Sequence, residues 1–140
     1  MVPWPGPWPG VTALLLILSL SVYNDGMSQS PLREPTFLIL TALAEKPQHG
    51  YGIMVDVDHM SGGRVKLRPG TLYAALDRVV EEGLVQADRE EIVDGRLRRY
   101  YRLTPPGRAR LTAEVERLRE NAAVAAQRLR LGARTIGDPA

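Results

Sequence analysis

The chain has 140 residues, which suits one compact domain with an accessory element but not two independent folds. It contains no cysteine, so a disulfide framework and thiolate chemistry are excluded. Formal net charge is only +2, and the two histidines, His49 and His59, have no second ligand at metal-binding spacing. The sequence therefore predicts neither a metal site nor a cofactor.

Residues 1–26 differ in composition from everything that follows. Trp-Pro repeats precede an apolar run from Val11 to Leu20. A membrane-spanning helix needs about 20 apolar residues, and this run is shorter. A signal peptide needs cations before its apolar run and a small-residue cleavage site after it, and this segment has neither of these. We expect no stable membrane association. A targeting segment, a disordered proline-rich tract and translation from an upstream start remain as interpretations. The last is favoured, with Met27 beginning the working protein.

Two helices are predicted next. Residues 34–45 carry a proline in the first turn and apolar side chains nearly all round, a pattern typical of a buried helix. A second helix is expected over residues 51–60, with Ile53, Val57 and Met60 on one side.

The Ser-Gly-Gly sequence at residues 61–63 ends this second helix. No Gly-Lys-Ser/Thr follows, so the glycine pair indicates a turn and not a phosphate-binding loop. Residues 64–67 alternate between polar and apolar, which predicts a short strand.

The stretch from Lys66 to Leu84 predicts a third helix with two unlike faces. Pro69 marks its start, Thr71 can cap it, and Gly83 can leave it. The face expected to pack inward is Leu72, Ala75, Leu76, Val79 and Val80. The open face is Gly70, Thr71, Ala74, Asp77, Arg78 and Glu81, with Tyr73 at its flank.

The N-terminal end of this third helix favours an anion. Small or hydroxylated side chains keep the backbone accessible there, and two cations, Lys66 and Arg68, precede it. Free N–H groups and the positive end of the helix dipole attract phosphate. The alternative is an ordinary amphipathic surface helix.

A β-hairpin is predicted after the third helix. Residues 84–90 and 98–103 have strand patterns, and Asp94-Gly95 between them favours a type I′ turn, whose two central positions require positive φ. Arg96 lies at the tip, where it suits phosphate or a narrow minor groove. Solubilising the turn is the alternative role for it.

The order of these elements predicts a winged helix-turn-helix, a mainly α fold with a small β-hairpin, over residues 32–104. In such a domain the third helix lies in the major groove and the wing lies along the backbone or minor groove. Arginines outnumber acids in the middle of the chain, which favours a polyanionic partner, although a charged stretch can also be a solvated surface.

Thr104-Pro105-Pro106-Gly107 begins the last predicted helix, over residues 105–131, before a tail at 132–140. Apolar residues in it are spaced alternately four and three apart, as in helices that pair lengthwise. These residues are Leu111, Val115, Leu118, Ala122, Ala125 and Leu129. The narrow stripe predicts a dimer interface; packing back on the first helix is the alternative.

Together these residues resemble the PadR family of winged-helix transcriptional regulators, over about Leu32 to Leu131. The most specific blocks are Pro-Gly-Thr-Leu-Tyr at 69–73 and Tyr-Tyr-Arg-Leu-Thr-Pro-Pro-Gly at 100–107. His-Gly-Tyr-Gly at 49–52 and Glu-Gly-Leu at 82–84 support the resemblance.

The resemblance implies a cytoplasmic homodimer that binds a palindromic operator in double-stranded DNA and represses the adjacent gene until a ligand or stress relieves it. Its half-sites would lie about one helical turn apart. The groove-reading helix would be Pro69 to Glu82 and the wing Ile92 to Arg98. The expected DNA-binding residues are Tyr51, Lys66, Arg68, Gly70, Thr71, Tyr73, Ala74, Arg78, Arg96 and Arg98.

Two features depart from the family pattern. Residues 1–26 have no counterpart, and Glu114 to Arg130 contains no aromatic residue to stack on a flat ligand, so the effector, if any, is unknown. An enzyme is disfavoured because no Ser-His-Asp arrangement, carboxylate pair or cofactor loop appears. A protein-interaction module that reuses the fold is the alternative, and the cations Lys66, Arg68 and Arg96 favour DNA over it.

Overall fold

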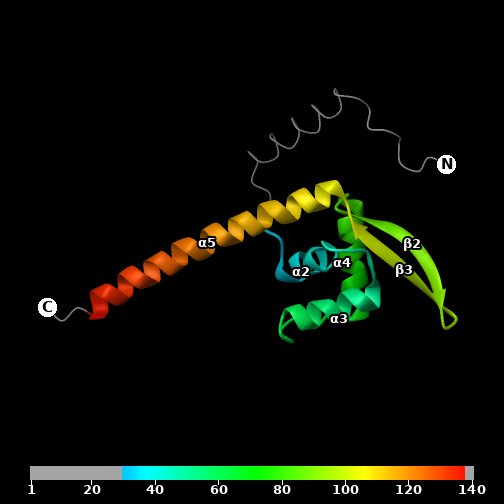
Figure 1. The fold of residues 1–140 in the computed structure, drawn as a ribbon, viewed down its shortest axis with the longest axis horizontal. Helices are drawn as coiled ribbons and strands as arrows, with labels where there is room; N and C mark the ends of the chain where they lie inside the picture. The colour runs from blue at the N-terminus through cyan, green and yellow to red at the C-terminus, as the bar shows by residue number, and fades with distance from the viewer. Residues whose placement is uncertain (1–29, 138–140) are drawn as a thin grey trace, which may run out of the picture. The chain divides into compact units, whose positions relative to one another are not determined.

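The computed structural model describes residues 30–137, so the predictions for residues 1–26 lie outside it. Within a unit that begins at Leu32, helices dominate and a small antiparallel sheet joins them, as predicted (Figure 1). In chain order the elements are α2 (Glu34–Ala42), β1 (Gln48–His49), α3 (Gly50–Met60), α4 (Pro69–Glu81), β2 (Val85–Val93), β3 (Arg96–Leu103) and α5 (Pro105–Gly137).

The sheet has three strands in the order β1-β3-β2. The strand predicted at residues 64–67 was wrong, because the third strand is instead β1, where His49 pairs with Tyr100. Residues 64–67 link α3 to α4, and they alternate because Val65 and Leu67 turn towards the core while their neighbours face solvent. The alternating pattern that predicted a strand thus comes from the packing of a connecting segment.

The core lies between the helices and the base of the hairpin. Its largest fully buried side chains are Ile39, Leu40, Ile53, Val57, Leu72, Leu76, Val79 and Val85. The predicted inner face of α4 is confirmed except at Val80, which is 40% exposed. One residue advances a helix by about 100°, so with Val79 at the centre of the interface its neighbour lies at the rim.

Both ends of α4 follow from local chemistry. Arg68 is extended, with φ −86° and ψ 153°, and Pro69 starts the helix. No side chain caps the first turn, so the prediction that Thr71 caps it was wrong: Thr71 lies inside the helix. Gly83 has φ +78° and ends the helix as predicted, because glycine adopts this conformation without strain.

The hairpin of β2 and β3 forms the wing. Asp94 and Gly95 have φ values of 52° and 75°, which confirms the predicted type I′ turn. The strands pair up to Val93 and Arg96 on either side of this turn, so both are longer than predicted. The wing therefore extends well beyond the core (Figure 1).

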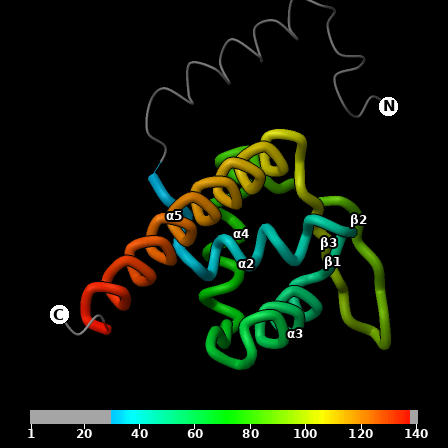
Figure 2. The backbone as a smooth tube through the Cα atoms, turned by 60° about the vertical axis from the view of Figure 1, so that its left-hand side comes forward, coloured from blue at the N-terminus to red at the C-terminus, as the bar shows by residue number. Residues whose placement is uncertain are grey.

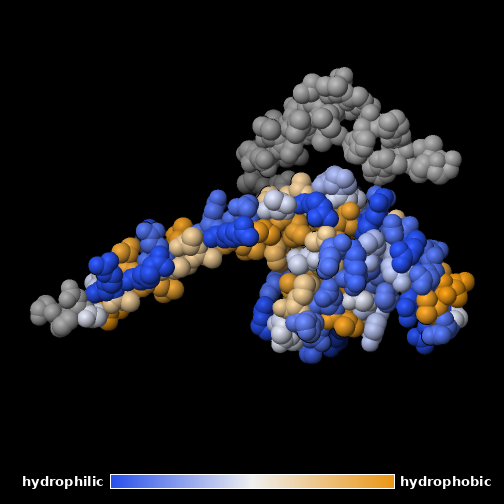
Figure 3. Space-filling model, in the orientation of Figure 1, coloured by the Kyte–Doolittle hydropathy of each residue, from blue (hydrophilic) through white to orange (hydrophobic). Residues whose placement is uncertain are grey.

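Helix α5 begins at a side-chain cap. The Thr104 hydroxyl accepts from the Gly107 N–H at 3.0 Å and donates to the Gly83 carbonyl at 2.6 Å, which ties the end of α4 to the start of α5. The helix continues to Gly137, past its predicted end at Leu131. Figure 2 shows its first turns beside α2, and Figure 3 shows apolar patches along the part that projects beyond the other helices.

Candidate nucleic-acid interface

The flank of α4 predicted to be open is exposed throughout. Leu72, Leu76 and Val79 anchor the helix, which leaves the opposite side to solvent. The exposed residues are Gly70, Thr71, Ala74, Asp77, Arg78 and Glu81. No side-chain cap is present at the first turn, so no capping side chain accepts from its backbone N–H groups. Small side chains and open donors at a helix N-terminus suit close approach to an anion.

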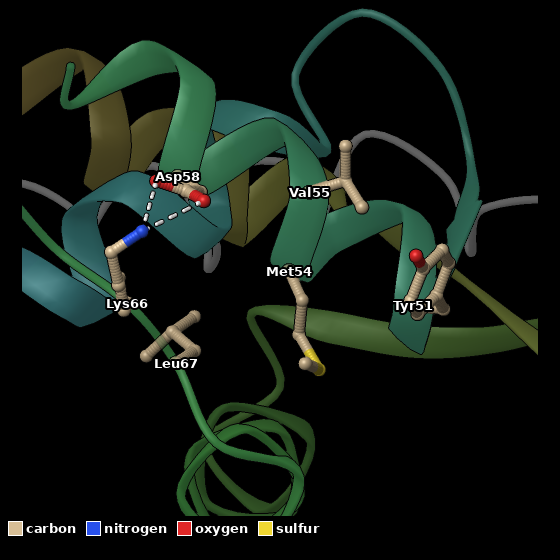
Figure 4. Close-up of a pocket in the computed structure, with 6 residues that line it drawn as sticks. All are labelled: Tyr51, Met54, Val55, Asp58, Lys66 and Leu67. Atoms are coloured by element: carbon tan, nitrogen blue, oxygen red, sulfur yellow. Dashed lines mark hydrogen bonds and ion pairs between the residues drawn. The ribbon is translucent and has the colours of Figure 1, made fainter. Parts of the chain in front are cut away.

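Two cations lie just before the start of α4. Lys66 and Arg68 are both exposed. The Lys66 ammonium lies 3.4 Å from the nearer carboxylate oxygen of Asp58 on α3. Figure 4 shows this ion pair at one end of a shallow pocket, with Tyr51 at the other end. An exposed pair of this kind is weak, so Lys66 can exchange Asp58 for a phosphate at little cost.

Tyr51 lies in the first turn of α3, and Tyr73 of α4 lies against Gly50, the residue before it. Tyr51 is 68% exposed and Tyr73 is 46% exposed. The Tyr73 ring lies over Gly50, where no side chain could be accommodated without moving the tyrosine. The partly exposed Tyr73 of α4 thus lies against the residue that precedes the exposed Tyr51.

The arginines of the wing lie on two different faces of β3. In a strand alternate residues share a face, so Arg96 and Arg98 lie on one side of β3 and Arg99 on the other. Arg99 pairs with Glu90 at 3.2 Å on its own side, next to the exposed apolar pair Ile92 and Leu97. Both predicted wing cations therefore lie on the same face.

This face of the wing continues into an aromatic cluster that sequence reasoning missed. The His49 ring lies 5.3 Å from the ring of Tyr100 and 6.5 Å from that of Tyr51, measured between centroids. Burial lowers the pKa of His49, and the nearby charge of Arg98 lowers it further, while Glu91 acts the other way. No sequence signal marks a strand of two residues, so this cluster could not be predicted; His49 is at once the last residue of β1 and the N-cap of α3.

The apolar stripe predicted as a dimer interface is buried at the start of α5 and exposed further along the helix. Leu111 is only 9% exposed and belongs to the core of its own chain, so its assignment to the dimer interface is corrected. Val115 is half-buried and Leu118 is partly exposed. The remaining residues of the stripe, Ala122, Ala125 and Leu129, are exposed. The same face of α5 thus packs on its own domain first and then faces solvent.

The part of the chain that the structure describes has neither a metal-binding cluster nor a membrane-spanning helix. Over residues 30–137, no group of three or more metal-ligating side chains is positioned to hold an ion. None of the helices in that range combines the length and the apolar character needed to cross a membrane.

Comparison with known proteins gives a consistent result. The sequence profile described as "Transcriptional regulator PadR-like family" matches residues 39–113. The transcriptional regulator Rv3488 of Mycobacterium tuberculosis is 42% identical over 82 residues, which cover 59% of this chain and 73% of that protein. An uncharacterized protein of Lysinibacillus sphaericus is 30% identical over 79 residues, covering 56% and 72%.

Solved structures also share the fold. A PadR family transcription regulator from Clostridium difficile superposes with a TM-score of 0.59 and 27% identity, over 69% of this chain and 99% of that one. Bacillus subtilis PadR, solved in complex with operator DNA, gives a TM-score of 0.53 at 23% identity, over 59% and 48%.

Proposed function

The chain belongs to the PadR-like family of transcriptional regulators, and from that membership we propose that it binds operator DNA as a homodimer and represses the neighbouring gene. The observation that carries the proposal is the exposed flank of α4, anchored by three buried side chains and approached by two cations. The winged-helix relative from Bacillus subtilis is solved with operator DNA, which supports the same partner here.

In the proposed complex α4 lies in the major groove with its N-terminal end foremost. Thr71, Ala74 and Arg78 face the base edges, where an arginine suits guanine and small apolar groups suit the thymine methyl. Gly70 lets the backbone come close to a phosphate. Lys66 and Arg68 contact the sugar–phosphate backbone, which fixes the position of the helix without reading sequence.

The remaining contacts of the proposed complex flank this helix. Tyr51 and Tyr73 donate from their phenol groups to phosphates beside the groove. Arg96 and Arg98, on one face of the wing, contact the backbone or the adjacent minor groove. Most of these groups are cations or hydroxyls with phosphate as their target, so affinity depends steeply on salt.

The proposed dimer uses the exposed half of α5. Leu118, Ala122, Ala125 and Leu129 continue a 3.5-residue repeat that has no partner among the described residues. Pairing these stripes about a twofold axis gives two copies of α4, which sets half-sites about one helical turn apart. We also propose that a ligand or a stress signal relieves this repression.

The proposal is tested by binding of the full chain to a labelled duplex from upstream of its gene, with a scrambled duplex as competitor. Arg96→Gln should weaken binding to both duplexes, and Arg78→Gln should change which sequence is preferred. Arg99→Gln removes the same charge from the opposite face of the wing and serves as the control for Arg96→Gln. Equal binding to both duplexes, with little loss as salt rises, would refute the proposal.

A further inference from the structure

The outer face of the sheet joins the two parts of the proposed DNA interface. Tyr73 of α4 touches the start of α3 at Gly50, and Tyr51 follows directly. His49 stacks near Tyr51 and pairs in register with Tyr100. From α4 to the sheet, each step is a contact between neighbouring residues.

The same face continues along β3 to the wing tip. Tyr100, Arg98 and Arg96 are alternate residues of one strand, and no bulge interrupts that strand, so their side chains share a side. The opposite side carries Tyr101, which is buried in the core. The face with Tyr100 is therefore the outer one, and it runs without a break from α3 to Arg96.

Arg89 of β2 is held on this face by Tyr100. Its guanidinium carbon lies 4.1 Å from the centroid of the Tyr100 ring, a cation–π arrangement that orients the group. Its ion pairs to Asp88 and Glu91 are both 3.6 Å long, and the Arg89 side chain is 56% exposed. Such pairs contribute little, so a phosphate can replace them.

We propose that this outer face is a second DNA contact surface, in which His49, Tyr100 and Arg89 bind the sugar–phosphate backbone between the major-groove helix and the wing. The inference rests on the proposed function, since it assumes that the chain binds DNA at all. It adds three residues to the interface, and it assigns to the β1–β3 pair the role of bridging the two DNA-contacting elements.

The chemistry of the surface fits a backbone strand. A protonated imidazole and a guanidinium both donate to phosphate oxygens, and a tyrosine ring packs against the deoxyribose between them. None of these groups is placed to read a base edge, so the surface raises affinity for every duplex. Its effect on sequence preference is correspondingly small.

His49 gives the surface a signature that can be measured. It faces Tyr51 on α3, Tyr100 and Arg98 on β3, and Glu91 on β2. In the free protein burial and Arg98 lower the pKa of His49, so the imidazole is neutral at pH 8. A phosphate oxygen beside the ring favours the charged form, so DNA binding takes up a proton and tightens as the pH falls.

The test measures the dissociation constant of the full chain for its upstream duplex at pH 8 and pH 6, at fixed ionic strength. We expect the wild-type protein to bind about five- to tenfold more tightly at pH 6, and His49→Gln to show little change. His59→Gln removes the only other histidine of the chain and should behave as the wild type does.

A second pair of variants tests the surface without touching the histidine. Arg89→Gln should weaken binding about three- to tenfold to specific and scrambled duplexes alike, and should reduce the salt dependence. Arg99→Gln is the matched control on the inner face. Thermal unfolding of each variant shows that the fold is intact, and Arg89→Gln decides the matter if His49→Gln does not fold.

The outcomes separate the two proposals. If the wild-type chain binds DNA but His49→Gln follows its pH dependence and Arg89→Gln matches Arg99→Gln, the second contact surface is overturned and the proposed function stands. If the wild-type chain does not bind any duplex, the proposed function fails and this inference fails with it.

Discussion

Tyr73 on α4 lies with its hydroxyl against Gly50, the first residue of α3, so closely that a β-carbon at position 50 would overlap the phenol. The two residues are far apart in the sequence, and their contact fixes how the aromatic flank of α4 is presented. The observed position of the Tyr73 ring therefore requires a glycine at position 50.

Gly50→Ala should displace Tyr73 with little loss of stability. The ring is 46% exposed and can move into solvent, so we expect a change of less than about 1 kcal/mol in the free energy of unfolding. DNA affinity should fall, because the phenol leaves its place. In a double-mutant cycle Gly50→Ala should have almost no effect on affinity when Tyr73 is already alanine; additive losses would show that the two residues act independently.

Gly107→Ala should be far more damaging. A β-carbon there would overlap the carbonyl of Leu84 and crowd Leu103, and the backbone of Leu84 cannot move without disturbing the start of β2. We expect a loss of about 3 kcal/mol or more in a urea titration. Gly132→Ala, on the open part of the same helix, should instead raise stability by about 0.5 to 1 kcal/mol. Similar effects at the two positions would contradict the close approach.

Glu114 should make stability depend on pH in the acid range. Its carboxylate is 3% exposed, accepts from the Leu32 N–H at 3.1 Å and pairs with Arg117. The hydrogen bond from Arg117, helped by that from Leu32, lowers the pKa of Glu114 against the opposing effect of burial. A carboxyl group with a lowered folded-state pKa stabilises fully above its unfolded value, about 4.3, and loses this contribution as the pH falls through the folded value.

Glu114→Gln should therefore cost about 1 to 3 kcal/mol at pH 7 and less at pH 3. Chemical denaturation at both pH values measures the difference. Glu116→Gln is the control, since Glu116 is exposed and pairs with the exposed Arg119. A loss that is the same at both pH values would show that the charge of Glu114 is not what stabilises the contact.

The proposed dimer should depend on the exposed stripe of α5. Leu129 is 74% exposed in the protomer, so Leu129→Glu leaves the fold intact and places a charge in the proposed seam. Sedimentation should then give monomers. Gln127→Glu adds the same charge on the opposite side of the helix and should leave the dimer unchanged. A dimer that survives Leu129→Glu would place the interface elsewhere.

The fold was largely predictable because its signals are local. Proline, glycine and the Asp-Gly turn punctuate the chain, and the apolar period of residues 69–81 places the inner face of α4 correctly. The predictions were wrong where tertiary packing, and not the local sequence, determines the structure. A strand of two residues has no signal of its own, and residues 64–67 alternate for a reason unrelated to pairing.

The exposed flank of α4 could be predicted, and the outer face of the sheet could not. Thr71, Arg78 and their neighbours follow from helical spacing alone. His49 and Tyr100 become neighbours only through the register of β1 with β3, which depends on contacts distant in the sequence. Likewise the repeat in α5 was visible, but the burial of Leu111 in the core depends on packing between elements that are distant in the sequence.

The position of α4 on the duplex can be measured by affinity cleavage, because the chain has no cysteine to compete with an introduced one. A cleaving reagent attached to Asp77→Cys, on the exposed flank of α4, should cut the upstream duplex from the major groove within two half-sites about one helical turn apart. The same reagent on Gln127→Cys, on α5, should not cut those positions. Identical cutting from both sites, or none from Asp77→Cys while the protein remains bound, would contradict a major-groove position for α4.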